Sequence, residues 1–173
     1  MNRANNPWRW RYFAYGSNLH PPRLTARLGA VAPLGVAALH GHQFQFHKWG
    51  KDGSAKADAR WTGRSSHRVW GALYGLSDGQ RRELDAIEGL GKGYQRAWLA
   101  VAGEVGFFYR ATSDAWDPEL KPFDWYRALV VAGGRYHGLP AAYLASIEAF
   151  EAVVDPDRER SASHWALLAA YGG

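Results

Sequence analysis

One glutamate near the middle of the chain has a position suited to acid–base chemistry. The residues 78–88 show helical periodicity, and Glu88 is the last of them, one turn after Leu84. The carboxylate then meets the negative end of the helix dipole, with Asp85 three residues before it. Partial burial adds to these two effects. All three disfavour the charged form, which makes the carboxylate a stronger base and suits it to general base catalysis. The alternative is an ordinary solvated surface glutamate.

A second candidate is the loop sequence YGSNL, which follows an aromatic strand-like run. Its small residues allow the backbone amides of Gly16 to Leu19 to point at one acceptor, and such amide clusters bind anions. Ser17 and Asn18 add short side-chain donors. The alternative is a plain turn in which Ser17 or Asn18 caps the next helix. Ser17 with His20 does not form a hydrolase pair, because the spacing departs from the nucleophile elbow.

Histidines and aromatic residues offer weaker signals. His40 and His42 share one face of a strand, as two metal ligands could, but His47 has the opposite parity and packed histidines are the commoner case. Several aromatic residues could either line a pocket or fill the core. They are Tyr94, Tyr109, Trp125, Tyr126 and Tyr136.

The composition is that of a globular chain with a substantial core. The sequence has 173 residues, 47% of them apolar, and we expect one domain over 1–173 with its core at about 10–155, a loose lead at 1–8 and a tail at 156–173. Nine Trp, nine Tyr and seven Phe favour strands and aromatic-lined pockets. The absence of cysteine excludes disulfides, a thiolate zinc site and a cysteine nucleophile.

The charge and hydropathy patterns set expectations about partners and location. The formal net charge is +5, but the basic residues are scattered without a Lys/Arg run, so nucleic acid is not the expected partner. No apolar stretch reaches the roughly 18 residues of a membrane span, and the first residues do not form an apolar signal segment. We therefore expect a cytoplasmic protein that does not bind membranes; its oligomeric state stays open.

The elements needed to position these residues follow from periodicity and breaker residues. Ser77 and Gln80 match the capping-box pattern, and Gly89 is a typical helix stop. The order of elements suggests an α+β fold around a mixed or barrel-like sheet. We expect strands at 10–15, 31–49 with a break near Gly41, 68–76, 94–102 and 105–112; helices at 21–28, 78–88, 123–138 and 139–153; loops at 50–67, with room for one short strand, and at 113–122; and a last apolar turn at 165–171.

Three segments, in this order and at suitable spacing, resemble the gamma-glutamylcyclotransferase family. They are YFAYGSNL (12–19), VWGALYGLSDGQRRELDAIEGLGKGY (69–94) and FDWYRALVVAGGRYHGLPAAYL (123–144). The likeness extends from about residue 12 to 155. The chain departs from the family pattern at His20, which replaces an aliphatic residue, at Phe123, and in the poorly matched strand before VWG.

The resemblance implies a compact mixed β-barrel with a few peripheral helices and a specific reaction. The family cyclises a γ-glutamyl group to 5-oxoproline and releases an amine, without a metal or another cofactor. By position, Glu88 is implied to be the general base and Tyr126 a hydroxyl donor. The loop amides are implied to hold either the substrate α-carboxylate or the oxyanion. The implied substrate-binding residues are Tyr15, Gly16, Ser17, Asn18, Leu19, His20, Tyr94 and Tyr126.

Several readings of function stay open at this level. The leaving group of a cyclotransferase could be an amino acid, γ-glutamyl-linked lysine, another γ-glutamylated metabolite or the remainder of glutathione. A second class is a non-catalytic member of the same fold that binds a small acidic ligand, although such a module has no need for Glu88. A third is a nucleic-acid-binding domain that uses the basic N-terminal part, which a steep salt dependence of binding would reveal.

Overall fold

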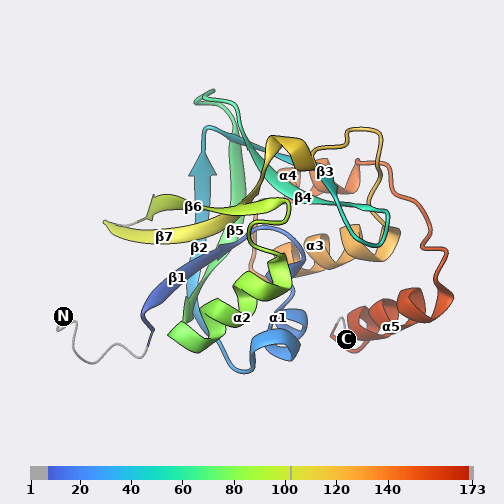
Figure 1. Ribbon diagram of the computed structural model, residues 1–173, viewed down its shortest axis with the longest axis horizontal. Helices are drawn as coiled ribbons and strands as arrows, with labels where there is room; N and C mark the ends of the chain where they lie inside the picture. The colour runs from blue at the N-terminus through green and yellow to red at the C-terminus, as the bar shows by residue number, and fades with distance from the viewer. Residues whose placement is uncertain (1–7, 102, 172–173) are drawn as a thin grey trace.

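The computed structural model describes residues 8–101 and 103–171, and its helices lie on one side of a twisted sheet (Figure 1). Most of the lead expected at 1–8, and residue 102 in the expected hairpin, lie outside the described residues. The strands are β1 (Trp10–Ala14), β2 (Ala32–His40), β3 (His42–Trp49), β4 (Ala55–Trp61), β5 (Arg68–Leu76), β6 (Tyr94–Val101) and β7 (Glu104–Ala111). The helices are α1 (Pro21–Leu28), α2 (Asp78–Glu88), α3 (Asp124–Tyr136), α4 (Ala141–Glu148) and α5 (Arg158–Ala169), with 3-10 turns at Ser17–Leu19 and Ser113–Ala115.

The strand β1 lies at the centre of a five-stranded sheet in the order β2-β5-β1-β7-β6. It pairs antiparallel with β5, from Trp10 opposite Leu76 to Ala14 opposite Ala72, and parallel with β7, where Tyr12 lies opposite Phe107. A strand flanked on both sides is held rigidly along its length. The chain that leaves β1 at Tyr15 therefore enters the interior at a fixed place.

The expected closed barrel is wrong for the described residues. The strands β3 and β4 pair only with each other, as a separate two-stranded sheet, and β2 and β6 are the two edges of the larger one. Side chains replace backbone pairing between the sheets. Asp58 of β4, which is fully buried, accepts the backbone amide of Ala111 at the end of β7 at 2.7 Å. The α+β class is confirmed, and its sheet is divided in two.

Local signals predicted most element boundaries, and three segments differ. The helix expected at 139–153 is the shorter α4, which spans Ala141–Glu148. The helix expected at 78–88 is present with both hydrogen bonds of its capping box, between Ser77 and Gln80. The loop expected at 50–67 contains β4, a full strand of seven residues. The tail forms the twelve-residue helix α5, because the Asp157 side chain accepts the amide of Arg160 and caps its first turn. The hairpin of β6 and β7 is confirmed on either side of residue 102.

The helix α3 packs against the turn that follows β1. Gly133 on α3 faces this turn so closely that a Cβ atom there would lie 2.4 Å from the backbone nitrogen of His20 and the carbonyl carbon of Leu19. Only a glycine allows two backbones to approach to this distance. This contact fixes the loop of Ser17 to Leu19 against the helix that carries Tyr126.

We predict that Gly133→Ala lowers the free energy of unfolding by about 1–3 kcal/mol, because the new methyl group meets rigid backbone atoms. Gly79→Ala is the matched control, since the nearest atom to its added Cβ is a side-chain oxygen of Ser77 at 3.8 Å. Alanine at this helical position should leave stability unchanged or raise it by up to ~1 kcal/mol. Urea denaturation measures both, and equal effects of the two substitutions would contradict the close packing.

Candidate active site

A small pocket opens where the end of β1, the end of α2 and the start of α3 meet. Most of the predicted site residues line it: Tyr15, Gly16, Ser17, Asn18, Glu88, Tyr94 and Tyr126. Tyr109, one of the aromatic residues considered for a pocket, also lines it, together with Tyr12 and Ala57, for which the sequence predicted no role in the site. We call this space the inner pocket. Its wall consists mainly of tyrosine rings around one carboxylate, so it offers several hydroxyls and one base to a ligand.

Glu88 is held in place at the end of α2. The helix ends there because Gly89 takes the left-handed conformation, with φ 69° and ψ 50°. The Glu88 Oε1 atom accepts a hydrogen bond from Asn18 Nδ2 at 2.9 Å and lies 3.3 Å from Arg27 Nη1. The side chain is 17% exposed, so most of it is shielded while part remains open to the pocket. The carboxylate is therefore fixed in position and still accessible from the pocket.

Asn18 connects three elements through one carboxamide. Its Nδ2 donates to Tyr12 of β1 at 2.9 Å as well as to Glu88 of α2. Its Oδ1 accepts from Arg27 of α1 at 2.8 Å. Both amide protons and the carbonyl oxygen are therefore used, which fixes the side chain in one orientation. Asn18 is 4% exposed, and its role is to position the carboxylate of Glu88.

The like charge that the sequence places beside Glu88 is compensated. Asp85 pairs with Arg81 at 2.5 Å and lies 3.5 Å from Arg96. It also accepts the hydroxyl of Tyr109 at 2.8 Å. Asp85 thus anchors Tyr109 in the pocket wall, and its negative charge is balanced by arginines on α2 and β6.

The pocket tyrosines divide into two groups by their hydrogen bonds. The hydroxyl of Tyr94 donates to the Ala57 carbonyl at 2.5 Å, and that of Tyr15 donates to the Tyr109 carbonyl at 2.5 Å. The hydroxyl of Tyr12 instead accepts from Asn18, and that of Tyr126 accepts from the Ala57 amide at 3.3 Å.

Burial, followed by nearby negative charge, raises the pKa of Tyr12 well above its ordinary value. Burial is also the largest cause of the raised pKa of Tyr126. Both phenols therefore keep their protons at neutral pH. Both accept the hydrogen bonds from Asn18 and from the Ala57 amide, and Tyr126 also interacts with the side chain of Ser17.

The two last residues of the predicted substrate loop lie outside the pocket lining. Leu19 is fully buried, and its amide donates to the Gly16 carbonyl at 2.9 Å, so it is used within the turn. His20 is 1% exposed and packs edge-on against Tyr171. Burial lowers the pKa of His20, and neither ring nitrogen has a hydrogen-bond partner among the described residues. The structure brings together Tyr15 to Asn18 and separates Leu19 and His20 from them.

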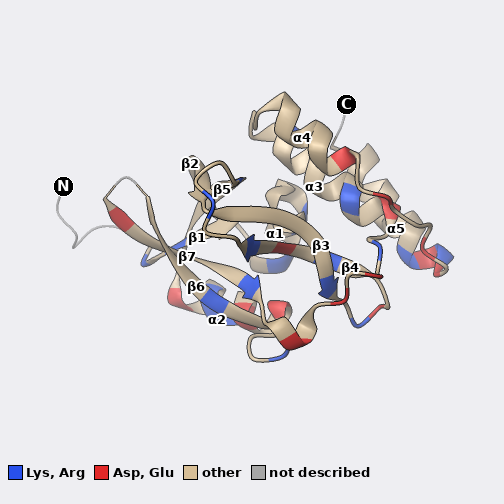
Figure 2. Cartoon of the chain, turned by 90° about the horizontal axis from the view of Figure 1, so that it is seen from above, with Lys and Arg blue, Asp and Glu red and all other residues tan. Residues whose placement is uncertain are grey.

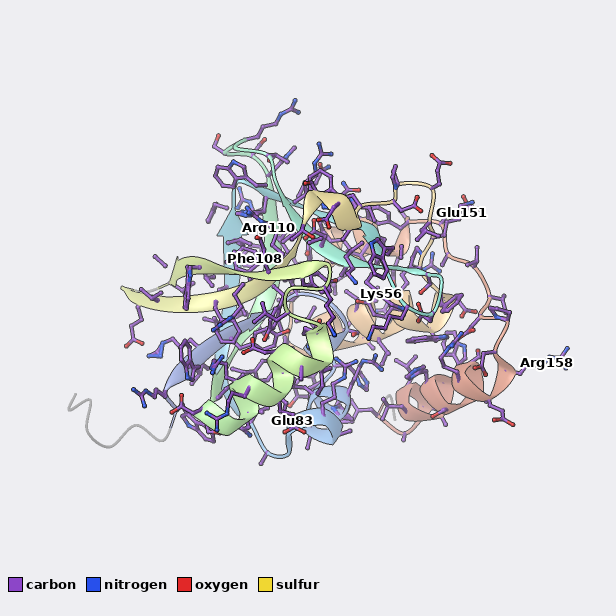
Figure 3. The ribbon with its side chains drawn as sticks, in the orientation of Figure 1. Lys56, Glu83, Phe108, Arg110, Glu151 and Arg158 are labelled. Atoms are coloured by element: carbon purple, nitrogen blue, oxygen red, sulfur yellow. The ribbon has the colours of Figure 1, made fainter. Side chains whose placement is uncertain are left out.

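A wider basin of about 430 Å³ continues outward from the inner pocket, sharing Ser17, Glu88, Tyr94 and Tyr126 with it. We call it the outer basin. Lys and Arg side chains from α1, β3, β4 and α5 line it, and blue segments mark α1, β3 and β4 in Figure 2. The side chain of Lys56 reaches from β4 toward α3 (Figure 3), with its ammonium 4.7 Å from the centre of the Tyr126 ring.

Most of this basic lining could not be predicted from the sequence. Arg23 and Arg27 are one helical turn apart on α1, and that spacing places them on one face. This spacing is the local sequence signal for a basic surface on α1. Lys48 and Lys56 enter the site only because the hairpin of β3 and β4 folds over it.

The remaining candidate residues are two histidines that pack against other side chains and three aromatic residues with different surroundings. His42 packs edge-on against Trp61 and Phe108. The Nε2 atom of His47 lies 2.8 Å from the carboxylate of buried Asp58, and the His47 ring stacks on Trp116. Of the aromatic residues considered, Tyr109 joins the inner pocket, Trp125 lines the outer basin, and Tyr136 is 59% exposed.

The fold and the site together define a small α+β protein with one carboxylate in a tyrosine-lined pocket. The family described as "Gamma-glutamyl cyclotransferase, AIG2-like" matches residues 12–127 of this chain. The chain therefore belongs to that family. The family predicted from three sequence segments is confirmed, and these relationships support an enzyme of this family.

Individual relatives agree with this assignment. The protein "Gamma-glutamylcyclotransferase" of Homo sapiens is 28% identical over 150 residues, which cover 81% of this chain and 78% of the relative. Its namesake from Mus musculus is 27% identical over the same shares. A solved structure named "Gamma-glutamyl cyclotransferase" superimposes with a TM-score of 0.79 at 22% identity, covering 93% of this chain and 98% of the other. That likeness shows the shared fold.

Within residues 8–101 and 103–171, no helix is both long enough and apolar enough to cross a membrane.

We predict that Asn18→Leu lowers the free energy of unfolding by about 1–3 kcal/mol, because the buried hydroxyl of Tyr12 and the carboxylate of Glu88 lose their amide donor. Gln95→Leu removes a carboxamide from the exposed face of β6 and should change stability by less than about 0.5 kcal/mol. Chemical denaturation compares the two. An Asn18→Leu protein as stable as the Gln95→Leu protein would contradict the bridging role.

Proposed function

We propose that this protein cyclises the γ-glutamyl group of a γ-glutamyl amine, amino acid or peptide to 5-oxoproline and releases the amine, with Glu88 as the general base. The observation that carries the proposal is the hydrogen bond from Asn18 that holds Glu88 at the floor of the tyrosine-lined pocket. The names of the human and mouse relatives support the reaction.

The chemistry is an intramolecular acyl transfer. The α-amino nitrogen of the substrate attacks its own γ-carbonyl carbon, a five-membered ring closes, and the bond from that carbon to the leaving nitrogen breaks. Of the three hydrogens on the α-ammonium group, one stays on the ring nitrogen and two end on the released amine. Glu88 relays them in turn, first as base and then as acid. Orientation alone gives such closures effective molarities on the order of 10⁵ M or more.

The surrounding groups supply orientation and charge stabilisation in this proposal. Tyr12 and Tyr126 keep their hydroxyl protons and can donate to the oxygen that becomes negative during attack. In this proposal the backbone amides of Gly16 and Ser17, at the start of the 3-10 turn, donate to the substrate α-carboxylate. Tyr94 and Tyr15 have donated their protons to carbonyls of the protein, so their rings shape the walls.

We predict that Glu88→Gln lowers the rate of 5-oxoproline release on the order of 10²–10⁴-fold, because the amide cannot accept the ammonium proton. Its thermal unfolding midpoint should stay near that of the wild type. Glu83→Gln is the matched control, since Glu83 lies exposed on the same helix and points away from the site (Figure 3). That variant should keep full activity. Near-normal release by Glu88→Gln would remove Glu88 from the proposed role.

A panel of γ-glutamyl amino acids, γ-glutamyl amines and glutathione tests the reaction itself, with 5-oxoproline as the measured product. Product from at least one of them is the expected result. A rise of the melting temperature with 5-oxoproline, without turnover of any substrate, would instead identify a binding protein of this fold.

A further inference from the structure

The outer basin contains more positive charge than its own carboxylates can balance. Two carboxylates line it, from Asp52 and Glu88. Lys56 pairs with Asp52 at 2.6 Å, and Arg27 lies 3.3 Å from Glu88, so both acids are already matched. Arg160 is held by Asp155, which its guanidinium contacts through two nitrogens at 2.6 and 2.5 Å. Other cations of the basin have no acidic partner among the described residues.

Lys48 is the clearest of these unbalanced cations. It is 7% exposed, and among the described residues no hydrogen bond or ion pair joins its ammonium to an acceptor. The Nζ atom lies 4.6 Å from the centre of the Trp49 ring and 4.9 Å from that of Tyr94. An ammonium that has only ring faces beside it, and no acid partner in the described part of the chain, is available to pair with an anion that enters the basin. Burial lowers the pKa of Lys48, and the nearby charge of Glu88 partly opposes this effect.

Arg23 is a second cation without a carboxylate in the described part of the chain. Its Nε donates to Ser17 Oγ at 3.1 Å, and its Nη1 lies 3.4 Å from His164 Nδ1. Burial, followed by the charge of Arg27, lowers the pKa of Arg23 to about 10. Burial and the surrounding cations lower the pKa of His164 to about 4, so it stays neutral at physiological pH. The cations of the basin outnumber the two carboxylates in its wall, so its net potential is positive.

We propose that the outer basin is an anion subsite, in which Lys48 and Arg23 bind carboxylates on the leaving side of the substrate. The proposal rests on the proposed function, because the γ-glutamyl end occupies the inner pocket beside Glu88. The preferred leaving amines are those with two or more carboxylates, such as an acidic amino acid or a further γ-glutamyl unit. An amine without a carboxylate leaves both cations unpaired and is a poor substrate.

Three substrates test this preference by kcat/KM for 5-oxoproline release, and the first two have leaving amines of equal size. Their leaving amines carry two, one and no carboxylates: γ-glutamyl-glutamate, γ-glutamyl-glutamine and γ-glutamyl-ethylamine. We expect each carboxylate to raise kcat/KM on the order of tenfold, as charge-assisted hydrogen bonds do. Raising the salt concentration should reduce the rate with the diacid most. Equal kcat/KM for the three substrates would overturn the subsite while leaving the proposed reaction intact.

Charge-removing variants locate the effect. Lys48→Met keeps an apolar chain beside the two rings and should reduce the preference for γ-glutamyl-glutamate over γ-glutamyl-ethylamine on the order of tenfold. Arg23→Gln should act in the same direction. Arg158→Gln removes a charge from an exposed residue that points away from the molecule at the start of α5 (Figure 3) and should leave the preference unchanged. A preference that survives both basin variants, or is lost equally in Arg158→Gln, would overturn the assignment.

A binding measurement separates this inference from the proposed reaction. Calorimetric titration of the same three compounds into Glu88→Gln protein, with and without Lys48→Met, does not depend on turnover. Tighter binding of the diacid that Lys48→Met removes supports the subsite, even if no compound yields 5-oxoproline and the proposed reaction fails. Indistinguishable affinities for the three compounds overturn the subsite, whatever the turnover.

Discussion

The carboxamide of Asn18 joins elements that lie far apart in the sequence. It connects Tyr12 on the central strand, Arg27 on α1 and Glu88 at the end of α2, and it uses each of its polar atoms to do so. A buried amide satisfied in this way has one orientation, and rotating it would break every contact at once. The position of Glu88 therefore depends on the path of the chain after β1, which is fixed in turn by the approach of Gly133 on α3.

The elements around this contact were predictable where the signals are local. The bounds of α1 and α2 follow from Pro21, the Ser77–Gln80 box and Gly89, all of which act within one helical turn. The strand β4 was expected only as a short strand within a loop, because its flanks are rich in glycine, serine and charge. For the tail, only an apolar turn near the end of α5 was predicted. The start of this helix depends on the Asp157 cap, which lies before the apolar residues. Arrangement of strands into two sheets depends on the buried Asp58 contact, which has no local signature.

The residues of the site likewise divide into those that the sequence predicted and those that it did not. Glu88 and the loop from Tyr15 to Asn18 were predicted because their types and positions are suggestive and a family resemblance supports them. Tyr12 and Arg27 were not predicted as site residues. Tyr12 belongs to the site through its hydrogen bond with Asn18, and Arg27 through its contact with Glu88 on another helix. His20 was expected beside the substrate, yet its side chain packs under Tyr171. Sequence neighbours of a site residue can point to the opposite side of the chain, as they do in this short turn.

The division of the sheet has a consequence for how this molecule can diverge. The hairpin of β3 and β4 carries Lys48 and Lys56, whereas Glu88 and Asn18 belong to elements attached to the larger sheet. The hairpin is joined to that sheet through side chains: Asp58 accepts the Ala111 amide, and the hydroxyl of Tyr94 donates to the Ala57 carbonyl. Changes of length or charge in the hairpin can thus accumulate without moving the backbone that carries the carboxylate. Two halves of one cleft are free to vary at different rates under selection.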